Sequence, residues 1–171
     1  MVSSMKVAIT GSPGVGKTSV ARLLAKRLKC PWLNERAFAV KKGIGAWDVR
    51  ENEFVVPLAA LRRELNLELR RRGRHQHLVV EGHLLCETRL DVDVVVVLRV
   101  HPEVLEARLE HRGYRAEKIQ DNVFCEGIDY CLKHALRKYG KKKVLEVQAK
   151  KGIKETMQHI ISGLRARGFL K

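Results

Sequence analysis

Apolar positions along the chain form two alternating patterns. Short runs dominated by Val, Ile and Leu alternate with longer segments in which apolar residues recur every three to four positions. The short runs predict buried strands, and the longer segments predict helices that cover them. Such alternation indicates an α/β fold with a parallel sheet flanked by helices. The five expected strands span residues 6–10, 31–33, 77–82, 92–100 and 143–148, and the expected helices span about 17–29, 57–69, 102–110, 116–139 and 153–164.

One stretch, residues 34–56, departs from both patterns. Gly43 and Gly45 interrupt any helical stripe there, and we expect an irregular segment. The chain has no internal repeat and no linker rich in Pro, Gly or Ser. Its 171 residues and 45% hydrophobic content therefore predict one globular domain over residues 1–171.

The segment between the first strand and the first helix is a phosphate-binding loop. Residues 11–18, GSPGVGKT, match G-x-x-x-x-G-K-[ST] at every fixed position. Glycines let backbone N–H groups turn toward phosphate oxygens, and the following helix N-terminus adds positive potential. Lys17 is expected to reach the β- and γ-phosphates, and the Thr18 hydroxyl is expected to hold Mg²⁺. The loop predicts a Mg²⁺–nucleotide site.

A second acidic group at the end of a neighbouring strand should help to hold the metal. The run at 92–100 carries its acids at the wrong end, whereas the run at 77–82 places Glu81 correctly. We therefore predict Glu81 as the carboxylate on the Mg²⁺ side, although most P-loop proteins have Asp there. His83 follows just beyond the strand end, close to the expected γ-phosphate or an attacking water. A lone histidine is otherwise more often a hydrogen-bonded bystander.

Among P-loop classes, GTPases carry D-x-x-G and N-K-x-D signatures that this chain lacks, and motors and AAA-type ATPases are much longer. A small chain with a P-loop near its start favours a nucleotide kinase. Such an enzyme needs an acceptor pocket and a lid arginine, because charge on the transferred phosphoryl group must be neutralised. We expect residues 34–57 to bind the acceptor. Three arginines around Gly113 make the lid candidate: Arg108, Arg112 and Arg115.

The chain is strongly basic, with 34 Lys and Arg against 19 Asp and Glu and a formal net charge of +15. Clusters at residues 70–77 and 137–143 are either a solvated surface or a contact with RNA or another polyanion. Few aromatic residues accompany them, which argues against base stacking. No apolar run approaches the roughly 18–20 residues of a membrane span, and no secretory signal is evident. We expect a cytoplasmic protein without a membrane partner.

Four segments together resemble one family. The stretches ITGSPGVGKTSVARLLAKRL, VVEGHL, VVVLRVHPEVLEARLEHRGY and EKIQDNVFCE are similar to adenylate kinase isoenzyme 6, the coilin-interacting nuclear ATPase type, in its archaeal form. The resemblance covers about residues 6–165. It implies a short-lid nucleoside monophosphate kinase fold that converts ATP and AMP into two ADP and also hydrolyses ATP. It further implies late small-subunit ribosome maturation, rRNA processing and binding to a platform ribosomal protein.

The resemblance also carries residue roles onto matching positions. Arg112, in the R-G-Y motif, would be the lid arginine on ATP, and residues 111–121 would be the lid. Glu81 replaces the Asp of the family's D-x-H motif, and His83 matches its His, as a residue that positions water or phosphate. The stretch at 34–39 lacks an Asp that the family carries, which affects acceptor contacts. The residues expected on the ATP phosphates are Gly14, Gly16, Lys17, Thr18 and Ser19.

Three functions stay open at this point. The first is a nucleoside monophosphate kinase with ATPase activity that acts in ribosome maturation. The second is an ATP-driven assembly factor with negligible kinase turnover. A platform ribosomal protein is basic and would be repelled at short range, so that contact would be locally acidic, through Asp48, Glu51 and Glu53, or mediated by RNA. The third is an RNA-binding module with a vestigial nucleotide site, against which the intact Lys17-Thr18 pair counts.

Overall fold

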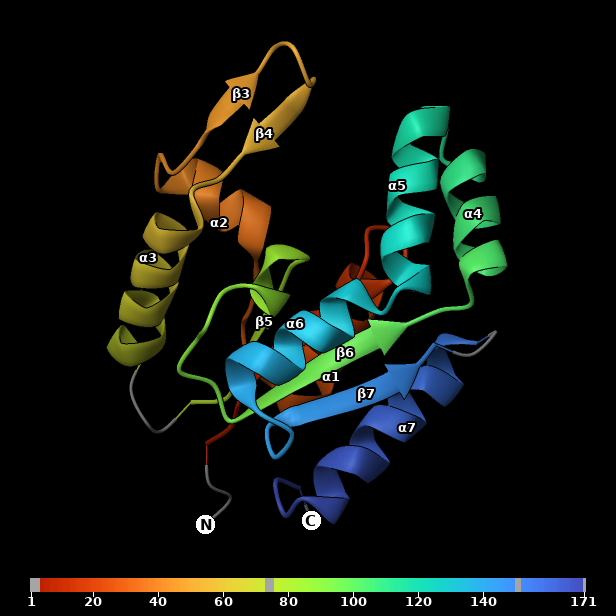
Figure 1. Ribbon diagram of the computed structural model, residues 1–171. Helices are drawn as coiled ribbons and strands as arrows, with labels where there is room; N and C mark the ends of the chain where they lie inside the picture. The colour runs from red at the N-terminus through yellow and green to blue at the C-terminus, as the bar shows by residue number, and fades with distance from the viewer. Residues whose placement is uncertain (1–3, 73–75, 150–151, 171) are drawn as a thin grey trace.

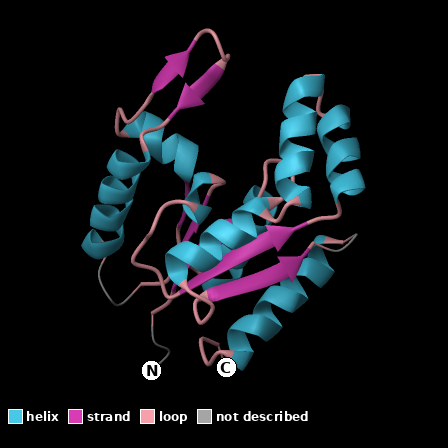
Figure 2. Ribbon diagram, viewed as in Figure 1, coloured by secondary structure: helices cyan, strands magenta, loops and turns pink. Residues whose placement is uncertain are grey.

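A parallel five-stranded sheet forms the centre of the molecule (Figures 1 and 2). The computed structural model describes residues 4–72, 76–149 and 152–170. The predicted fold class is confirmed, because the apolar runs form adjacent parallel strands in the order β2-β5-β1-β6-β7. These strands are β1 (Lys6–Thr10), β2 (Trp32–Asn34), β5 (Leu78–Glu81), β6 (Val94–Arg99) and β7 (Val144–Gln148).

Helices cover both faces of this sheet and explain why β6 is apolar at almost every position. Val94 and Val96 pack into a cluster with α1 and α7, whereas Val95 and Val97 pack into a second cluster with α3 and α6. A strand buried on both faces has no solvent side, so alternation disappears from its sequence. The covering helices are α1 (Lys17–Leu28) and α7 (Ile153–Ala166) on one face, and α3 (Leu58–Arg71) and α6 (Tyr130–Tyr139) on the other.

The single helix expected over residues 116–139 is wrong, because the chain forms two helices there. The first, α5 (Ala116–Gly127), ends before Asp129, which has a left-handed backbone with φ of 60°. An interaction distant in sequence accompanies this break, since the Asp129 carboxylate accepts a hydrogen bond from Arg99 at 2.5 Å. A stripe of apolar residues cannot reveal such a break.

The prediction that residues 34–56 are irregular is also wrong in part. Helix α2 (Glu35–Lys41) begins there, and the Asn34 side chain caps it by accepting a hydrogen bond from Ala37 N at 2.9 Å. The helix ends before Gly43, as the sequence indicates. A hairpin follows, in which Gly45 is required: a Cβ there would lie 2.4 Å from the carbonyl oxygen of Val55. The hairpin strands are β3 (Ala46–Asp48) and β4 (Glu53–Val55).

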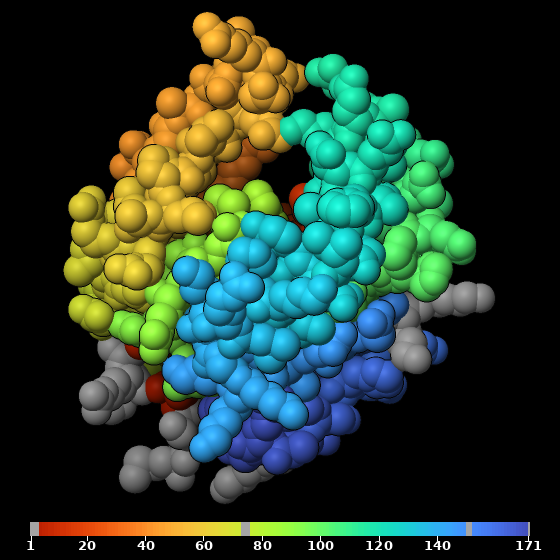
Figure 3. Space-filling view, viewed as in Figure 1, coloured from red at the N-terminus to blue at the C-terminus, as the bar shows by residue number. Residues whose placement is uncertain are grey.

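Two walls rise from the carboxyl ends of the strands. Helix α2 and the β3–β4 hairpin form one wall, and α4 (Pro102–His111) with α5 forms the other (Figure 1). The space-filling view shows a hollow between the hairpin and α5 (Figure 3). Above it Lys118 on α5 and Glu53 on the hairpin form an ion pair. Ligands of parallel α/β sheets bind at this end of the strands.

None of the helices within the described ranges combines the length and apolar character that crossing a membrane requires.

Candidate active site

The phosphate-binding loop joins β1 to α1, and glycine is required at two of its positions. Gly11 has φ of 144°, and a Cβ there would lie 2.4 Å from the carbonyl oxygen of Leu98. Gly14 has φ of 92°, and its Cβ would lie 2.8 Å from side-chain atoms of both Leu105 and Leu109. The loop is therefore fixed by contact with β6 and α4. Its backbone leads directly into the N-terminus of α1.

Lys17 lies within its own loop. Its Nζ donates hydrogen bonds to the carbonyl oxygens of Gly11 and Ser12, at 2.8 and 2.9 Å. Burial lowers the pKa of this ammonium, and the nearby Glu81 and Glu35 carboxyls work against that shift. A phosphate would offer the ammonium a charged acceptor in place of two neutral carbonyls. The Lys17 ammonium therefore lies at the loop, where it would be close to a phosphate bound there.

Thr18 and Glu81, the two predicted metal ligands, lie in direct contact. The Thr18 hydroxyl donates to Glu81 Oε1 at 3.0 Å, and Asn34 Nδ2 donates to the same oxygen at 2.6 Å. Sheet pairing explains the arrangement, because Asn34 and Glu81 are partners at the ends of β2 and β5. A hydroxyl and a carboxylate are oxygen ligands of the kind that Mg²⁺ takes, so these residues fit the ion. Sequence reasoning missed Asn34, although its place at the end of the second strand was a usable signal.

His83 faces the hollow and has an acidic neighbour that sequence reasoning did not identify. Its Nδ1 lies 3.5 Å from Oε1 of Glu35. The His83 side chain is 53% exposed, yet desolvation within the hollow, together with the charges of Lys17 and Arg36, lowers its pKa to about 4. Burial raises the pKa of Glu35 to about 8, against the effect of the Leu84 amide and Lys17. At neutral pH the pair is therefore mostly a carboxylic acid beside a neutral imidazole, with little ion-pair character.

Glu35 also explains the glycine between Glu81 and His83. The Glu35 side chain is only 2% exposed, and one of its oxygens, Oε2, has no hydrogen-bond partner in the described part of the chain. A Cβ on Gly82 would lie 2.1 Å from that oxygen. Any larger residue at position 82 would displace the carboxyl from its place behind His83.

A second buried carboxylate, Glu126, holds the loop from the side of α5. Its Oε2 accepts a hydrogen bond from the Ser12 hydroxyl at 2.6 Å. Its Oε1 accepts from Arg99 Nε at 2.6 Å and from Val100 N at 3.2 Å. Sequence reasoning gave Glu126 no role. The one feature of the sequence that could have pointed to Glu126 is its position at the end of EKIQDNVFCE, one of the four segments that carry the family resemblance.

The phosphate-binding loop lies between two cavities. One has a volume of 540 Å³ and lies against α4 and the start of α7. The other has a volume of 730 Å³ and lies between α2, the hairpin and α5. The first is lined by Gly14, Gly16, Ser19, Arg108, Arg112 and Thr156, among others. The second is lined by Lys17, Thr18, Glu81, His83, Arg115 and Lys118, among others.

The three candidate lid arginines are divided between these cavities. Arg112, which follows the last residue of α4, lines the smaller one together with Arg108. Arg108 also donates a hydrogen bond to the carbonyl oxygen of Val15 at 3.4 Å. Arg115 lines the larger cavity and pairs with Glu117 at 2.9 Å. The segment between α4 and α5 therefore contributes positive charge to both sides of the loop.

The sheet order and the phosphate-binding loop define the chain as a P-loop protein with a kinase fold. Two solved structures share this architecture at low sequence identity. A gluconokinase from Sinorhizobium meliloti 1021 has a TM-score of 0.62 and 18% identity, covering 95% of this chain and 92% of that one. A shikimate kinase from Bacteroides thetaiotaomicron has a TM-score of 0.60 and 19% identity, covering 94% and 98%.

Sequence comparison identifies the family. Residues 7–129 match a family described as an AAA domain. A Pyrococcus furiosus protein named "Putative adenylate kinase" is 38% identical over 168 residues, covering 95% of this chain and 88% of the relative. A Pyrococcus abyssi protein of the same name is 40% identical over 164 residues, covering 96% and 86%. The chain belongs to this family of P-loop kinases.

The family match corrects one expectation from the sequence, and the names of the relatives support one part of the family resemblance. Chain length argued against an AAA-type protein, yet the matching family carries that description. The curated names bear out the adenylate kinase part of the resemblance and say nothing of ribosome maturation.

Proposed function

We propose that the protein is a nucleoside monophosphate kinase that transfers the γ-phosphoryl group of ATP to AMP. One observation carries the proposal: the phosphate-binding loop separates two cavities, each supplied with arginine from the segment between α4 and α5. Phosphoryl transfer requires a donor and an acceptor on opposite sides of the transferred group, nearly in line. The smaller cavity would take the donor nucleotide, and the larger one would take the acceptor.

The residue roles follow from this assignment. Gly14, Gly16 and Ser19 would bind ATP phosphates together with Arg112, and Lys17 would neutralise charge on the transferred group. Thr18 and Glu81 would hold Mg²⁺, which when bound neutralises charge on the β- and γ-phosphates. Residues 34–57 would bind the monophosphate, and residues 111–121 would act as the lid.

Chemistry at this site would depend mainly on positioning. An oxygen of the AMP phosphate attacks the γ-phosphorus, the bond to the β–γ bridging oxygen breaks, and ADP is released from each side. The attacking phosphate is already anionic, so no strong base is needed. His83 would face the acceptor phosphate with its neutral imidazole, and its larger role would be to orient water when no acceptor is bound.

The test is formation of ADP by the purified protein in the presence of ATP, AMP and Mg²⁺. We expect a rate well above a control with ATP alone. Lys17→Ala, with its melting temperature measured to confirm folding, should lose that activity. If ADP forms at the same rate with and without AMP, the kinase assignment is wrong.

ATP hydrolysis is a second candidate activity, and the position of His83 favours it. The imidazole lies on the same cavity as Glu81 and Lys17, where water could take the place of the acceptor. Hydrolysis in the absence of AMP, lost in Lys17→Ala, would support it. A phosphate release rate equal to that of a protein-free blank would contradict it.

The resemblance to the ribosome maturation family supplies a third proposal, action on the small ribosomal subunit in the cytoplasm. The β3–β4 hairpin carries Asp48, Glu51 and Glu53, an acidic group suited to a basic platform ribosomal protein, and the basic clusters elsewhere on the chain would suit contact with rRNA. Co-purification from cell lysate with and without ATP tests it. Recovery of a small-subunit ribosomal protein in only one of the two samples is the expected result, and recovery in neither would contradict the proposal.

A further inference from the structure

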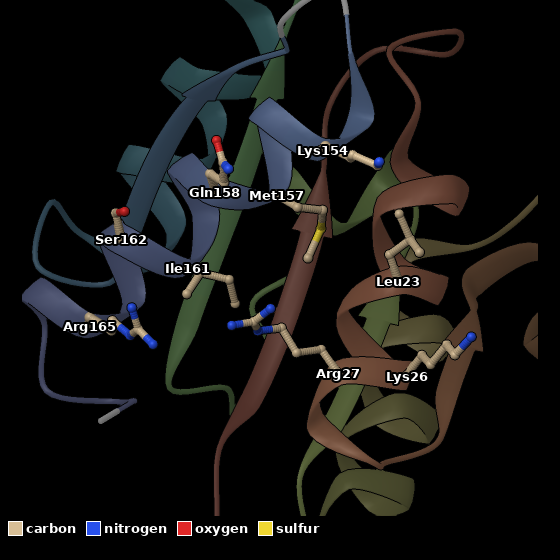
Figure 4. A pocket seen from close by; sticks show the side chains of 9 residues that line it. All are labelled: Leu23, Lys26, Arg27, Lys154, Met157, Gln158, Ile161, Ser162 and Arg165. Carbon is tan, nitrogen blue, oxygen red and sulfur yellow. The ribbon is translucent and has the colours of Figure 1, made fainter.

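A third cavity lies away from the phosphate-binding loop, between α1 and α7 (Figure 4). It has a volume of 720 Å³, and we refer to it as the α1–α7 groove. None of its lining residues belongs to either cavity of the candidate active site. They are Leu23, Lys26, Arg27, Lys154, Met157, Gln158, Ile161, Ser162 and Arg165.

The groove arises from the spacing of residues on the two helices. The lining residues on α1 are separated by three positions and then by one, so they lie on one side of the helix. They are Leu23, Lys26 and Arg27. The core contacts of α1 are made by other residues, including Leu24. On α7 the lining residues recur every three or four positions from Lys154 to Arg165 and form one stripe toward α1.

The lining combines aliphatic and cationic side chains. Leu23, 39% exposed, and the partly buried Met157 supply apolar surface, and the buried Ile161 lies at the floor of the groove. Figure 4 shows the Met157 side chain directed toward α1, and the Arg27 guanidinium lying in the space between the two helices. Four of the nine lining residues are Lys or Arg, and none is Asp or Glu. The groove therefore presents a narrow apolar strip, formed mainly by Leu23 and Met157, with cationic side chains along and beside it.

We propose that the α1–α7 groove binds an acidic amphipathic segment of a partner protein. Apolar side chains on one face of such a segment, at helical spacing, would pack on Leu23 and Met157. Its carboxylates would then pair with the cations that border this apolar surface, including Arg27 and Lys154. Charge complementarity selects an acidic partner, and the apolar strip selects an amphipathic one.

An acidic peptide segment fits the groove better than RNA does. The phosphate backbone would satisfy the cations but would leave the exposed surface of Leu23 and Met157 without apolar contacts. The bases bind protein surfaces through aromatic stacking, and no aromatic residue lines the groove. RNA is accordingly the alternative that the test must separate.

The probe is a fluorescein-labelled helical peptide with Leu at positions i, i+3, i+4 and i+7 and Glu on its flanks. Binding is measured by fluorescence anisotropy. The double variant Arg27→Glu/Lys154→Glu should weaken binding about tenfold or more, because two attractions become two repulsions. Lys138→Glu/Lys141→Glu, which changes the net charge equally at an exposed site outside the groove, should retain it. Thermal melts confirm that both variants fold.

Two further comparisons make the result decisive. Leu23→Gln should weaken binding of the amphipathic peptide, and a peptide of identical composition with scrambled order should bind more weakly to the native protein. Equal binding of both peptides, or equal binding by both double variants, would overturn the proposal. So would a single-stranded RNA oligonucleotide that binds more tightly than the peptide and loses affinity only in Arg27→Glu/Lys154→Glu.

Discussion

Ser12 in the phosphate-binding loop donates a hydrogen bond of 2.6 Å to Glu126, 114 residues further along the chain. Glu126 lies in the last turn of α5, whose first turn carries Lys118 on the wall of the larger cavity. The same carboxylate accepts hydrogen bonds from Arg99 and Val100 at the end of β6. The loop is therefore held in place by close packing at Gly11 and Gly14 and by the hydrogen bond to Glu126. Glu126 belongs to α5, which also forms one wall of the cleft.

The first prediction concerns the strength of this connection. Ser12→Ala and Glu126→Gln should each lower the free energy of unfolding by about 1–3 kcal/mol, because each disrupts a buried hydrogen bond. The double variant should lose less than the sum of the two, since both single changes remove one shared interaction. Denaturant unfolding of the four proteins measures the coupling. Strictly additive losses would show that the two residues act independently.

The second prediction concerns the pH dependence of stability due to Glu35. Its pKa is raised from 4.5 to about 8 in the folded protein, so the folded state binds the extra proton between these pH values. The contribution of Glu35 to the free energy of unfolding is fully present below pH 4.5. As pH rises toward 8, this contribution falls by at most about 1.4 kcal/mol per pH unit. Glu35→Gln mimics the protonated form and should remove that loss.

Unfolding free energies of both proteins from pH 5 to 9 test this. The free energy of unfolding of the variant, relative to that of the native protein, should increase from pH 5 to about 8 and level off above pH 8. The contribution of His83 has the opposite sign and acts below pH 6.5, but both proteins contain it, so it largely cancels in the difference. A difference that does not change with pH would contradict the elevated pKa of Glu35.

The third prediction concerns Glu81. Glu81→Gln keeps an oxygen within reach of Thr18 and Asn34 but removes the charge that attracts the metal. The Mg²⁺ concentration for half-maximal ADP formation should rise about tenfold or more, by analogy with losses at other metal sites. Glu87→Gln, a neighbouring change on the same cavity, is the matched control. An unchanged Mg²⁺ requirement in Glu81→Gln would place the metal elsewhere.

The fourth prediction separates water from AMP as the acceptor. Water must be oriented before it attacks, whereas an AMP phosphate is already a bound anion. His83→Gln should therefore reduce ATP hydrolysis by about 10²-fold and reduce AMP-dependent ADP formation much less. His101→Gln, an exposed histidine that lines neither cavity, should change neither rate. Equal losses in both reactions would indicate a general role in phosphate binding.

The pKa of His83 adds a pH signature to that comparison. With this pKa near 4, the imidazole stays neutral throughout the range from pH 5.5 to 8. In an NMR titration of the nucleotide-free protein, the His83 imidazole should show no inflection near pH 6.5. A histidine-dependent inflection there would show that the imidazole titrates as it does in water.

The sequence predicted the features that depend on short-range patterns. The valine-rich runs predicted the parallel strands, and the loop motif predicted the position of Lys17. The contact between Thr18 and Glu81 followed because parallel strands end at the same edge of the sheet. Each of these inferences needed only residues close in sequence and one rule of sheet geometry.

Features that depend on contacts between distant segments could not be predicted in the same way. Glu126 and Glu35 are acids on helices, a position that usually faces solvent, and only the packed fold shows that both are buried. The break between α5 and α6 accompanies the pairing of Asp129 with Arg99. Helix α2 and the hairpin are short elements, and their apolar positions are too few to establish a period.

The ion pair between Lys118 and Glu53 joins the two walls that enclose the larger cavity. Both side chains are partly exposed, so dissolved salt weakens their attraction. If product escape limits turnover, as in many enzymes with closing lids, the working rate of this protein would increase with ionic strength. The salt concentration of the surrounding medium would then regulate the turnover rate through this one ion pair at the entrance.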